Sequence, residues 1–213
     1  DDVLQQFLDE SLHQLVILGA GYDSRAYRFA LAGVKTFEVD HPATQPDKLA
    51  KVRKILGKLP AHVHYVSVDF NTQTLESRLL AAGYDPALKT LFIWQGVTMY
   101  LTAEAVDSTL AFVAKHSGPG SAIVFDYLYR NAFDGTHKQN EVINMRRYRF
   151  LTGEGLTFSI PESGVEAFLL ERGFHQIKDI NAEDLKTAYF IGKNANRQVV
   201  GGYGIVIGKI KER

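Results

Sequence analysis

The chain has 213 residues, of which 46% are hydrophobic and 23% are charged, so it has the composition of a folded domain rather than of a disordered segment. Its 24 basic and 24 acidic residues give a net charge of zero, so the composition lacks the excess of positive charge that is usual in nucleic-acid-binding proteins. The chain contains no cysteine, which excludes disulfides, thiolate metal sites and cysteine nucleophiles.

The chain opens with an amphipathic helix over about residues 1–12, followed by a short apolar strand and a glycine-rich turn. The strand, residues 15–18, is apolar throughout, which is typical of a strand buried on both faces of an α/β sheet. Gly19 and Gly21 then allow a sharp turn and the close approach of a ligand. Asp23 stands where a helix N-cap belongs, before a helix predicted over residues 26–30. This pattern predicts a cofactor loop, although a tight turn without a ligand is the alternative.

The residues of this turn favour a cofactor that carries positive charge and no phosphate. A dinucleotide fingerprint would have a third glycine where Ser24 stands. Asp23 would repel a pyrophosphate at the helix N-terminus, a position that normally attracts one. S-adenosylmethionine fits because it carries an ammonium and a sulfonium group. Asp40 ends the second apolar strand and is placed to accept hydrogen bonds from ribose hydroxyls, a role that both S-adenosylmethionine and NAD would require.

Strands and helices continue to alternate as far as about residue 127. The pattern predicts helices at residues 43–56 and 72–82, strands at residues 62–68, 91–94 and 122–127, and a further helix that Thr102 caps and that ends at residues 118–120. Such alternation predicts right-handed crossovers and a parallel sheet. The strand at residues 62–68 alternates in polarity, so we expect it to be less buried than the others.

The remainder of the chain has a different character. Residues 130–157 are polar, with a basic run at Arg146, Arg147 and Arg149, and we expect a helical excursion over the mouth of the site. A last core helix is predicted from Pro161. Strands at residues 174–180 and 199–210, joined by a short helix at residues 182–188, predict an antiparallel pair at a sheet edge. A bulge or bend is expected at residues 201–202.

Five parallel strands followed by this pair resemble the sheet of the Rossmann-like class I methyltransferases. That α/β fold has a seven-stranded, mostly parallel sheet with one antiparallel strand near the C-terminus. We expect a single domain over residues 1–213. No apolar run approaches the roughly 18 residues of a membrane span, and no signal peptide is recognised, so we expect a cytoplasmic protein without a membrane partner. The oligomeric state stays open.

Three motifs in consistent order resemble those of the leucine carboxyl methyltransferase family, in particular its bacterial S-adenosylmethionine-dependent O-methyltransferases. The motifs are GAGYDSRAYR at residues 19–28, FEVDHP at residues 37–42 with Lys48 following, and IWQGVTMYL at residues 93–101. The resemblance is strong as far as Tyr127 and looser beyond it. It implies an S-adenosylmethionine-dependent methyltransferase that acts on a small-molecule acceptor.

The resemblance also assigns the cofactor site. Gly19 and Gly21 would line the methionine part, Asp40 would hold the ribose, and Asp69 and Phe70 would flank the adenine. A helix N-cap is the alternative role of Asp69, and a surface ion pair is the alternative role of the family arginine, Arg25. The complete set of expected cofactor-binding residues is Gly19, Ala20, Gly21, Asp23, Arg25, Asp40, His41, Asp69, Phe70, Gln95 and Gly96.

The sequence departs from the family pattern in two places. Gln95 stands where the family usually has glutamate, which removes one negative charge near the cationic end of the cofactor. The family also carries an N-terminal segment with an arginine that pairs with the cofactor carboxylate, and we expect that segment to be missing from these 213 residues, either cut or disordered. No catalytic residue is assigned.

Other chemistry is disfavoured. His62 and His64 lie on one face of a strand but lack a third ligand, so no metal site is expected. Ser117 and Ser163 lie outside any nucleophile elbow, and core packing is the expected role of Tyr100, Tyr127 and Tyr129. An NAD-linked dehydrogenase and a non-catalytic S-adenosylmethionine-binding module are the alternative functions.

The acceptor atom is predicted from what a hydroxyl would need. A hydroxyl acceptor must lose a proton and calls for a positioned base, but neither a histidine nor an acid has an obvious claim to that role. A carboxylate, with a pKa of about 4, is already ionised at neutral pH. Arg146, Arg147 and Arg149 could supply its cationic neighbour, so the sequence predicts a methyl ester as the product.

Overall fold

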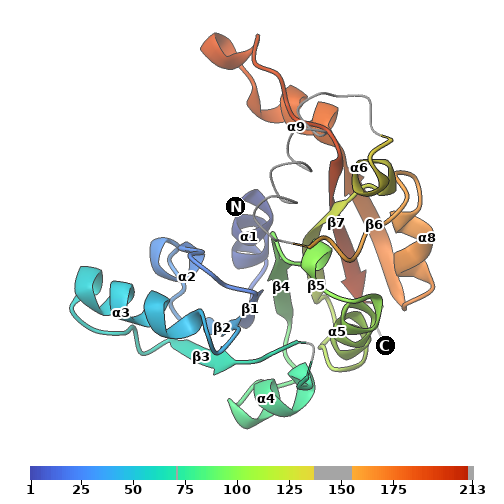
Figure 1. The fold of residues 1–213 in the computed structure, drawn as a ribbon. Coiled ribbons are helices and arrows are strands. Elements are labelled where there is room, and N and C mark those ends of the chain that lie inside the picture. Colours follow the sequence, from blue (N-terminus) through green and yellow to red (C-terminus); the bar gives the residue numbers. More distant parts are fainter. Residues whose placement is uncertain (71, 137–154, 211–213) are drawn as a thin grey trace.

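The computed structural model describes residues 1–70, 72–136 and 155–210. Its helices and strands alternate along most of the chain, as the sequence predicts (Figure 1). In chain order they are α1 Asp2–Asp9, β1 Gln14–Leu18, α2 Arg25–Arg28, β2 Lys35–Asp40, α3 Gln45–Leu56, β3 Val63–Ser67, α4 Leu75–Ala81, β4 Thr90–Trp94, η1 Thr98–Tyr100, α5 Ala103–Lys115, β5 Ala122–Leu128, α6 Arg130–Asp134, α8 Val165–Leu170, β6 Phe174–Ile180, α9 Ala182–Tyr189, η2 Gly192–Asn194 and β7 Tyr203–Ile210.

The strands form one seven-stranded sheet in the order β3-β2-β1-β4-β5-β7-β6. Strands β1 to β5 are parallel, and β7 pairs antiparallel with both β5 and β6, so the predicted mostly parallel sheet with one reversed strand is confirmed. The order reverses between β1 and β4, which are direct neighbours. In open α/β sheets ligands bind at such a switch point, outside the carboxyl ends of the strands.

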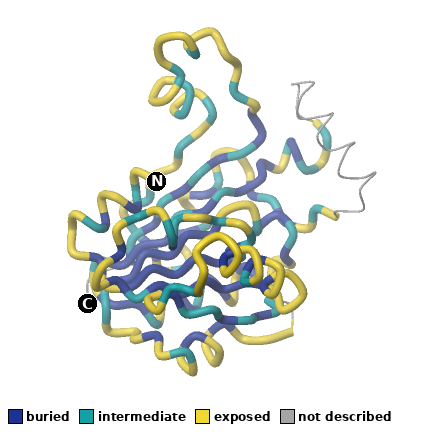
Figure 2. The backbone as a smooth tube through the Cα atoms, turned by 90° about the vertical axis from the view of Figure 1, so that its left-hand side faces the viewer, coloured by how far each residue is buried: buried dark blue, intermediate teal, exposed yellow. Residues whose placement is uncertain are grey.

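Apolar side chains on the two faces of the sheet form two separate cores. One core joins alternate residues of the central strands, including Val16 and Leu18, to the buried faces of α4, α5 and α8. The other core joins Leu15 and Ile17 to α1 and α2. Because successive strand residues point to opposite faces, a run that is apolar at every position serves both cores. The central strands are accordingly buried along their length (Figure 2).

Several local predictions are confirmed. The side chain of Thr102 caps α5 by accepting a hydrogen bond from the amide of Ala105 at 3.2 Å. Strand β3 lies at the sheet edge and is less buried than β1 and β4, as its alternating polarity predicts. The short helix between the last two strands is present as α9 and begins with a capping box formed by Asn181 and Asp184. The core roles predicted for Tyr127 and Tyr129 also hold, since both are buried.

Other local predictions are wrong. Helix α2 is a single turn that ends before residue 30, and α4 begins at Leu75 rather than at residue 72. Strand β7 begins only at Tyr203. A register shift lies in β6, between His175 and Lys178, whereas residues 201–202 hold the expected bend, at Gly202, just before β7. The predicted arginine-rich excursion largely lies outside the described residues.

The connection between β6 and β7 stands away from the sheet. Figures 1 and 2 show α9 and η2 projecting from the body of the molecule. Among the described residues α9 buries no side chain, but the hydroxyl of Tyr189 donates to the Asp2 carboxylate on α1 at 2.5 Å. Within the described part of the chain, no helix is both long and apolar enough to cross a membrane.

Candidate cofactor site

The glycine turn follows β1 at the switch point, and its two glycines are required for different reasons. Gly19 has φ +64°, and a Cβ there would lie 2.3 Å from Cγ2 of Val97, so close packing within the chain demands glycine. Gly21 has φ +41°, but its nearest described neighbour would be the Gly19 carbonyl oxygen at 3.9 Å. Only Gly21 therefore leaves open space of the kind that a ligand could approach.

The first turn of α2 is closed by an acidic side chain. The Asp23 carboxylate accepts a hydrogen bond from the amide of Arg25 at 2.7 Å. Ser24, rather than Asp23, occupies the N-cap position, and its side chain makes no capping bond. The predicted N-cap is thus displaced by one residue, yet Asp23 still satisfies an amide at the helix start. An anion at this point would meet a carboxylate that already occupies the amide.

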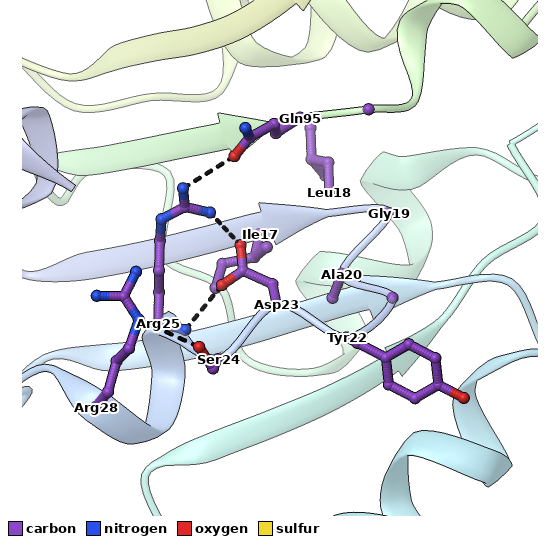
Figure 3. Close-up of a pocket in the computed structure, with 12 residues that line it drawn as sticks. Ile17, Leu18, Gly19, Ala20, Tyr22, Asp23, Ser24, Arg25, Arg28 and Gln95 are labelled. Atoms are coloured by element: carbon purple, nitrogen blue, oxygen red, sulfur yellow. Dashed lines mark hydrogen bonds and ion pairs between the residues drawn. The ribbon is translucent and has the colours of Figure 1, made fainter. Parts of the chain in front are cut away.

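Arg25 gathers three side chains at the same end of the sheet, and Figure 3 shows two of them, Asp23 and Gln95. Its guanidinium forms an ion pair with Asp23, donates from Nε to the Asp1 carboxylate at 3.0 Å, and donates to Oε1 of Gln95 at 2.9 Å. The Arg25 side chain is only 16% exposed. The predicted ion pair exists, and it also brings Gln95 at the end of β4 against the residues that follow β1.

These residues line a cavity of about 470 Å³. Most of the predicted set contributes to it: Gly19, Ala20, Gly21, Asp23, Arg25, Gln95 and Gly96. A second cavity of about 370 Å³ is lined by Gly21, Tyr22, Asp40, Ala43, Thr44, Asp47 and Lys48. Gly21 and Tyr22 line both cavities, which therefore adjoin across the glycine turn. Figure 3 shows the Tyr22 ring pointing away from the first cavity.

Asp40 ends β2 and holds the turn in place. One carboxylate oxygen accepts a hydrogen bond from the amide of Gly21 at 2.9 Å, and the other accepts from the amide of His41 at 2.8 Å. Asp40 is 8% exposed. Because each carboxylate oxygen can accept more than one hydrogen bond, both retain capacity for further donors.

The residues predicted to flank an adenine lie beyond the two cavities. His41 Nε2 is 3.9 Å from a carboxylate oxygen of Asp69, which also accepts a hydrogen bond from the Thr72 hydroxyl at 2.8 Å. Phe70 packs against the core on the α4 and α5 face. Since α4 begins at Leu75 with Thr74 at its N-cap, Asp69 is not a helix N-cap.

Comparison with known proteins now identifies the family. The model of the leucine carboxyl methyltransferase family matches residues 1–114, which is more than half of the chain. The chain belongs to this family. The sequence resemblance carried by the three motifs is thereby confirmed.

Two curated proteins of similar sequence are bacterial. The putative S-adenosyl-L-methionine-dependent methyltransferase YktD of Bacillus subtilis is 31% identical over 198 residues, which span 92% of this chain and 65% of YktD. The protein SCO7813 of Streptomyces coelicolor, described in the same words, is 37% identical over 123 residues, which span 57% of this chain and 43% of that protein. The chain therefore covers less than two thirds of the length of these relatives.

Solved structures share the fold at low sequence identity. A carbon methyltransferase, CurJ, superposes with a TM-score of 0.63 at 13% identity, covering 99% of this chain and 52% of that chain. The magnesium protoporphyrin IX methyltransferase of Synechocystis, solved with S-adenosylhomocysteine, gives 0.58 at 12% identity and covers 99% of this chain and 80% of its own. At these identities the likeness establishes the fold alone.

For a leucine carboxyl methyltransferase family member, the site has one feature that the sequence analysis missed. Glu38 and Lys48, 1% and 4% exposed, form a buried ion pair with 2.7 Å between Nζ and the carboxylate. The Tyr27 hydroxyl also donates to Glu38 at 2.7 Å. Burial raises the pKa of Glu38, and the Lys48 ammonium acts in the opposite direction. The sequence signal for this pair is an acid, Glu38, inside an apolar strand, followed by Lys48 near the start of the next helix.

Three of the remaining candidates of the sequence analysis, His62, His64 and Ser117, have structural roles. The imidazole of His62 contacts the Ala26 carbonyl oxygen at 3.0 Å, and His64 stacks on Phe37. The described residues contain no cluster of three histidine, cysteine, aspartate or glutamate side chains that could hold a metal ion. The hydroxyl of Ser117 donates to the Val113 carbonyl oxygen at 2.6 Å. Arg146, Arg147 and Arg149 lie outside the described residues.

Proposed function

We propose that this chain forms the cofactor-binding part of an S-adenosylmethionine-dependent O-methyltransferase that methylates a carboxylate or hydroxyl of a small molecule. Membership of the leucine carboxyl methyltransferase family supports the reaction class. One observation carries the choice of cofactor: the Asp23 carboxylate occupies the first amide of α2, where a dinucleotide would place its pyrophosphate. A cofactor with cationic groups and no phosphate suits this end of the sheet, whereas NAD does not.

The charges around the two cavities support the same cofactor. Asp23 and Asp40 contribute carboxylates, and Arg25 is already paired with acids and with Gln95. Gln95 would offer a neutral hydrogen-bonding group to the methionine end. Asp40, with acceptor capacity left on both oxygens, would hold the ribose hydroxyls, and Asp69 and Phe70 would flank the adenine. When bound, S-adenosylmethionine supplies an electrophilic methyl group on its sulfonium.

The contribution of the chain to the reaction would be positioning. Donor and acceptor atoms held in line at short distance react far faster than the same groups free in solution. The glycine turn and Asp40 come from rigid strand ends, which favours such an arrangement. A carboxylate acceptor, already ionised at neutral pH, would need orientation and a cationic neighbour but no general base. We therefore favour a carboxylate acceptor, and a methyl ester as the product.

Calorimetry on the purified chain tests the choice of cofactor. We expect S-adenosylhomocysteine to bind with a stoichiometry of one, and NAD at the same concentration to give no heat of binding. Asp69→Asn should weaken the binding of S-adenosylhomocysteine. The matched control is Asp107→Asn, because Asp107 lies on the exposed side of α5 and pairs with Arg172. Binding of NAD without S-adenosylhomocysteine would overturn the proposal in favour of a dehydrogenase.

Transfer of a labelled methyl group tests the reaction. The chain is incubated with labelled S-adenosylmethionine and a panel of small carboxylic acids and phenols. We expect label in a product that releases methanol under mild alkali, as an ester does. A product that keeps its label in alkali would contradict the carboxylate acceptor and indicate a hydroxyl. Cofactor binding without transfer to any acceptor would favour the non-catalytic binding module.

A further inference from the structure

We propose that Lys48 is a positioning residue, which locks the peptide between Ala20 and Gly21 in the orientation that the nucleoside site requires. The inference rests on the proposed function for its consequence, because that peptide forms the turn between the two cavities. Lys48 reaches the turn from α3, and its side chain lines the same cavity as Asp40 and Gly21.

Lys48 is placed by burial and by charge together. Its ammonium lies 2.7 Å from Glu38, 3.4 Å from the Ala20 carbonyl oxygen, and 5.6 Å from the centre of the Tyr27 ring. The Glu38 contact is the strong one, and the bond to Ala20 is long but assisted by the charge. Glu38 thus holds the ammonium beside the turn, where the ammonium donates to the Ala20 carbonyl oxygen.

Both polar groups of the peptide between Ala20 and Gly21 are therefore held by charged side chains. In a trans peptide the carbonyl and the following amide point in opposite directions. Lys48 takes the carbonyl oxygen of Ala20, and the Asp40 carboxylate takes the amide of Gly21 at 2.9 Å. A cation on the oxygen and an anion on the amide hydrogen both favour the same orientation of the peptide plane.

This peptide needs such a clamp because glycines flank Ala20. Gly19 and Gly21 both adopt positive φ, and glycine passes between positive and negative φ at little cost. If the peptide turned over, the Ala20 carbonyl would point toward the Asp40 carboxylate and would withdraw the Gly21 amide from it. Asp40 would then lose the contact that orients it toward the cavity.

A contribution to folding stability does not by itself explain why Glu38 and Lys48 are buried. Removing both members of a buried ion pair is often neutral for stability, whereas removing one member leaves an unpaired charge and is costly. A variant that loses both charges can therefore separate positioning from folding. The chain also offers a matched control in Lys54 on the same helix, which is exposed and lines neither cavity.

The test compares wild type with the double variant Glu38→Gln/Lys48→Met, and with Lys54→Met as control. Two quantities are measured: hydrogen exchange of the amides of residues 19–22 in the free protein, and the affinity for S-adenosylhomocysteine. We expect a thermal midpoint close to that of wild type, at least tenfold faster exchange in the turn, and at least tenfold weaker binding, which is about 1.4 kcal/mol. Lys54→Met should leave both quantities unchanged.

Wild-type exchange and wild-type affinity in a folded double variant would overturn the inference. If wild type itself fails to bind S-adenosylhomocysteine, the proposed function fails, and hydrogen exchange in the free protein still decides the role of Lys48. If the double variant does not fold, Glu38→Gln/Lys48→Gln keeps polar groups at both positions but shortens the side chain at position 48. Unchanged exchange in that variant would equally overturn the inference.

Discussion

At the scale of single residues, the site depends on side chains that bond to the backbone before they bond to a ligand. Asp40 accepts one amide hydrogen on each carboxylate oxygen, and Asp23 satisfies an amide of α2. Such bonds fix a carboxylate in one orientation without using all of its acceptor capacity. A ligand then meets groups that are already ordered, which lowers the entropic cost of binding.

Asp40→Asn should therefore weaken the binding of S-adenosylhomocysteine by about 1 to 3 kcal/mol. The amide nitrogen of the new side chain would face either a backbone N–H or a ribose hydroxyl, each of which needs an acceptor. Calorimetry measures the effect. Asp107→Asn is the control, since Asp107 pairs with Arg172 on the exposed side of α5 and lines neither cavity. Equal affinities for wild type and a folded Asp40→Asn variant would remove Asp40 from the site.

At the scale of secondary-structure elements, the reversed strand β7 fits between β5 and β6 because glycine alternates along one of its faces. Tyr127 on β5 is buried, and its hydroxyl donates to both oxygens of Asp179 on β6 at 3.0 Å. Its ring crosses β7 at Gly204, where an added Cβ would lie 2.6 Å from Cε1. Burial raises the pKa of Tyr127, so the hydroxyl keeps the proton that it donates.

Gly204→Ala should lower the free energy of unfolding by about 1 to 3 kcal/mol, the usual cost of overfilling a packed site, because the tethered Tyr127 ring cannot move aside freely. Gly208→Ala on the same face is the control, since its Cβ would meet Leu169 and Phe174 at a milder 3.3 Å. Urea unfolding followed by circular dichroism gives both values. A Gly204→Ala variant no less stable than Gly208→Ala would show that the ring adjusts.

At the scale of the whole molecule, one sheet separates two apolar cores. The core on one face is built from α4, α5 and α8, and the core on the other face from α1 and α2. Both cores draw on the same strands, since residues of β1 alternate between them. Loss of either core would leave a face of the sheet exposed to water, so we expect residues 1–213 to unfold as a single domain.

Leu110→Ala on α5 and Leu4→Ala on α1 should each lower the free energy of unfolding by about 2 to 5 kcal/mol, because both side chains are buried in their respective cores. Far-ultraviolet circular dichroism reports on the whole sheet, and fluorescence of Trp94, the single tryptophan, reports on the α5 face. The two signals should shift together in both variants. Separate transitions would indicate two independent units.

The sequence by itself determined the features that neighbouring residues decide. The apolar runs of β1 and β4 predicted strands buried on both faces, the glycines after β1 predicted the turn, and Thr102 predicted the start of α5. These signals succeed because side-chain periodicity, φ preference and capping act over a few residues. The three motifs also predicted the family, because each lies at the end of a strand where the backbone constrains the residue type.

Only the tertiary structure decided which distant groups meet. The apolar Leu56 at the end of α3 is 48% exposed, whereas the charged Lys48 on the same helix is buried because Glu38 pairs with it. Gly19 is required by Val97 from the turn after β4 rather than by a ligand alone, and Gln95 faces Arg25. A buried charge or a close backbone contact depends on a partner that is distant in the sequence, and the local pattern of polar and apolar residues does not identify that partner.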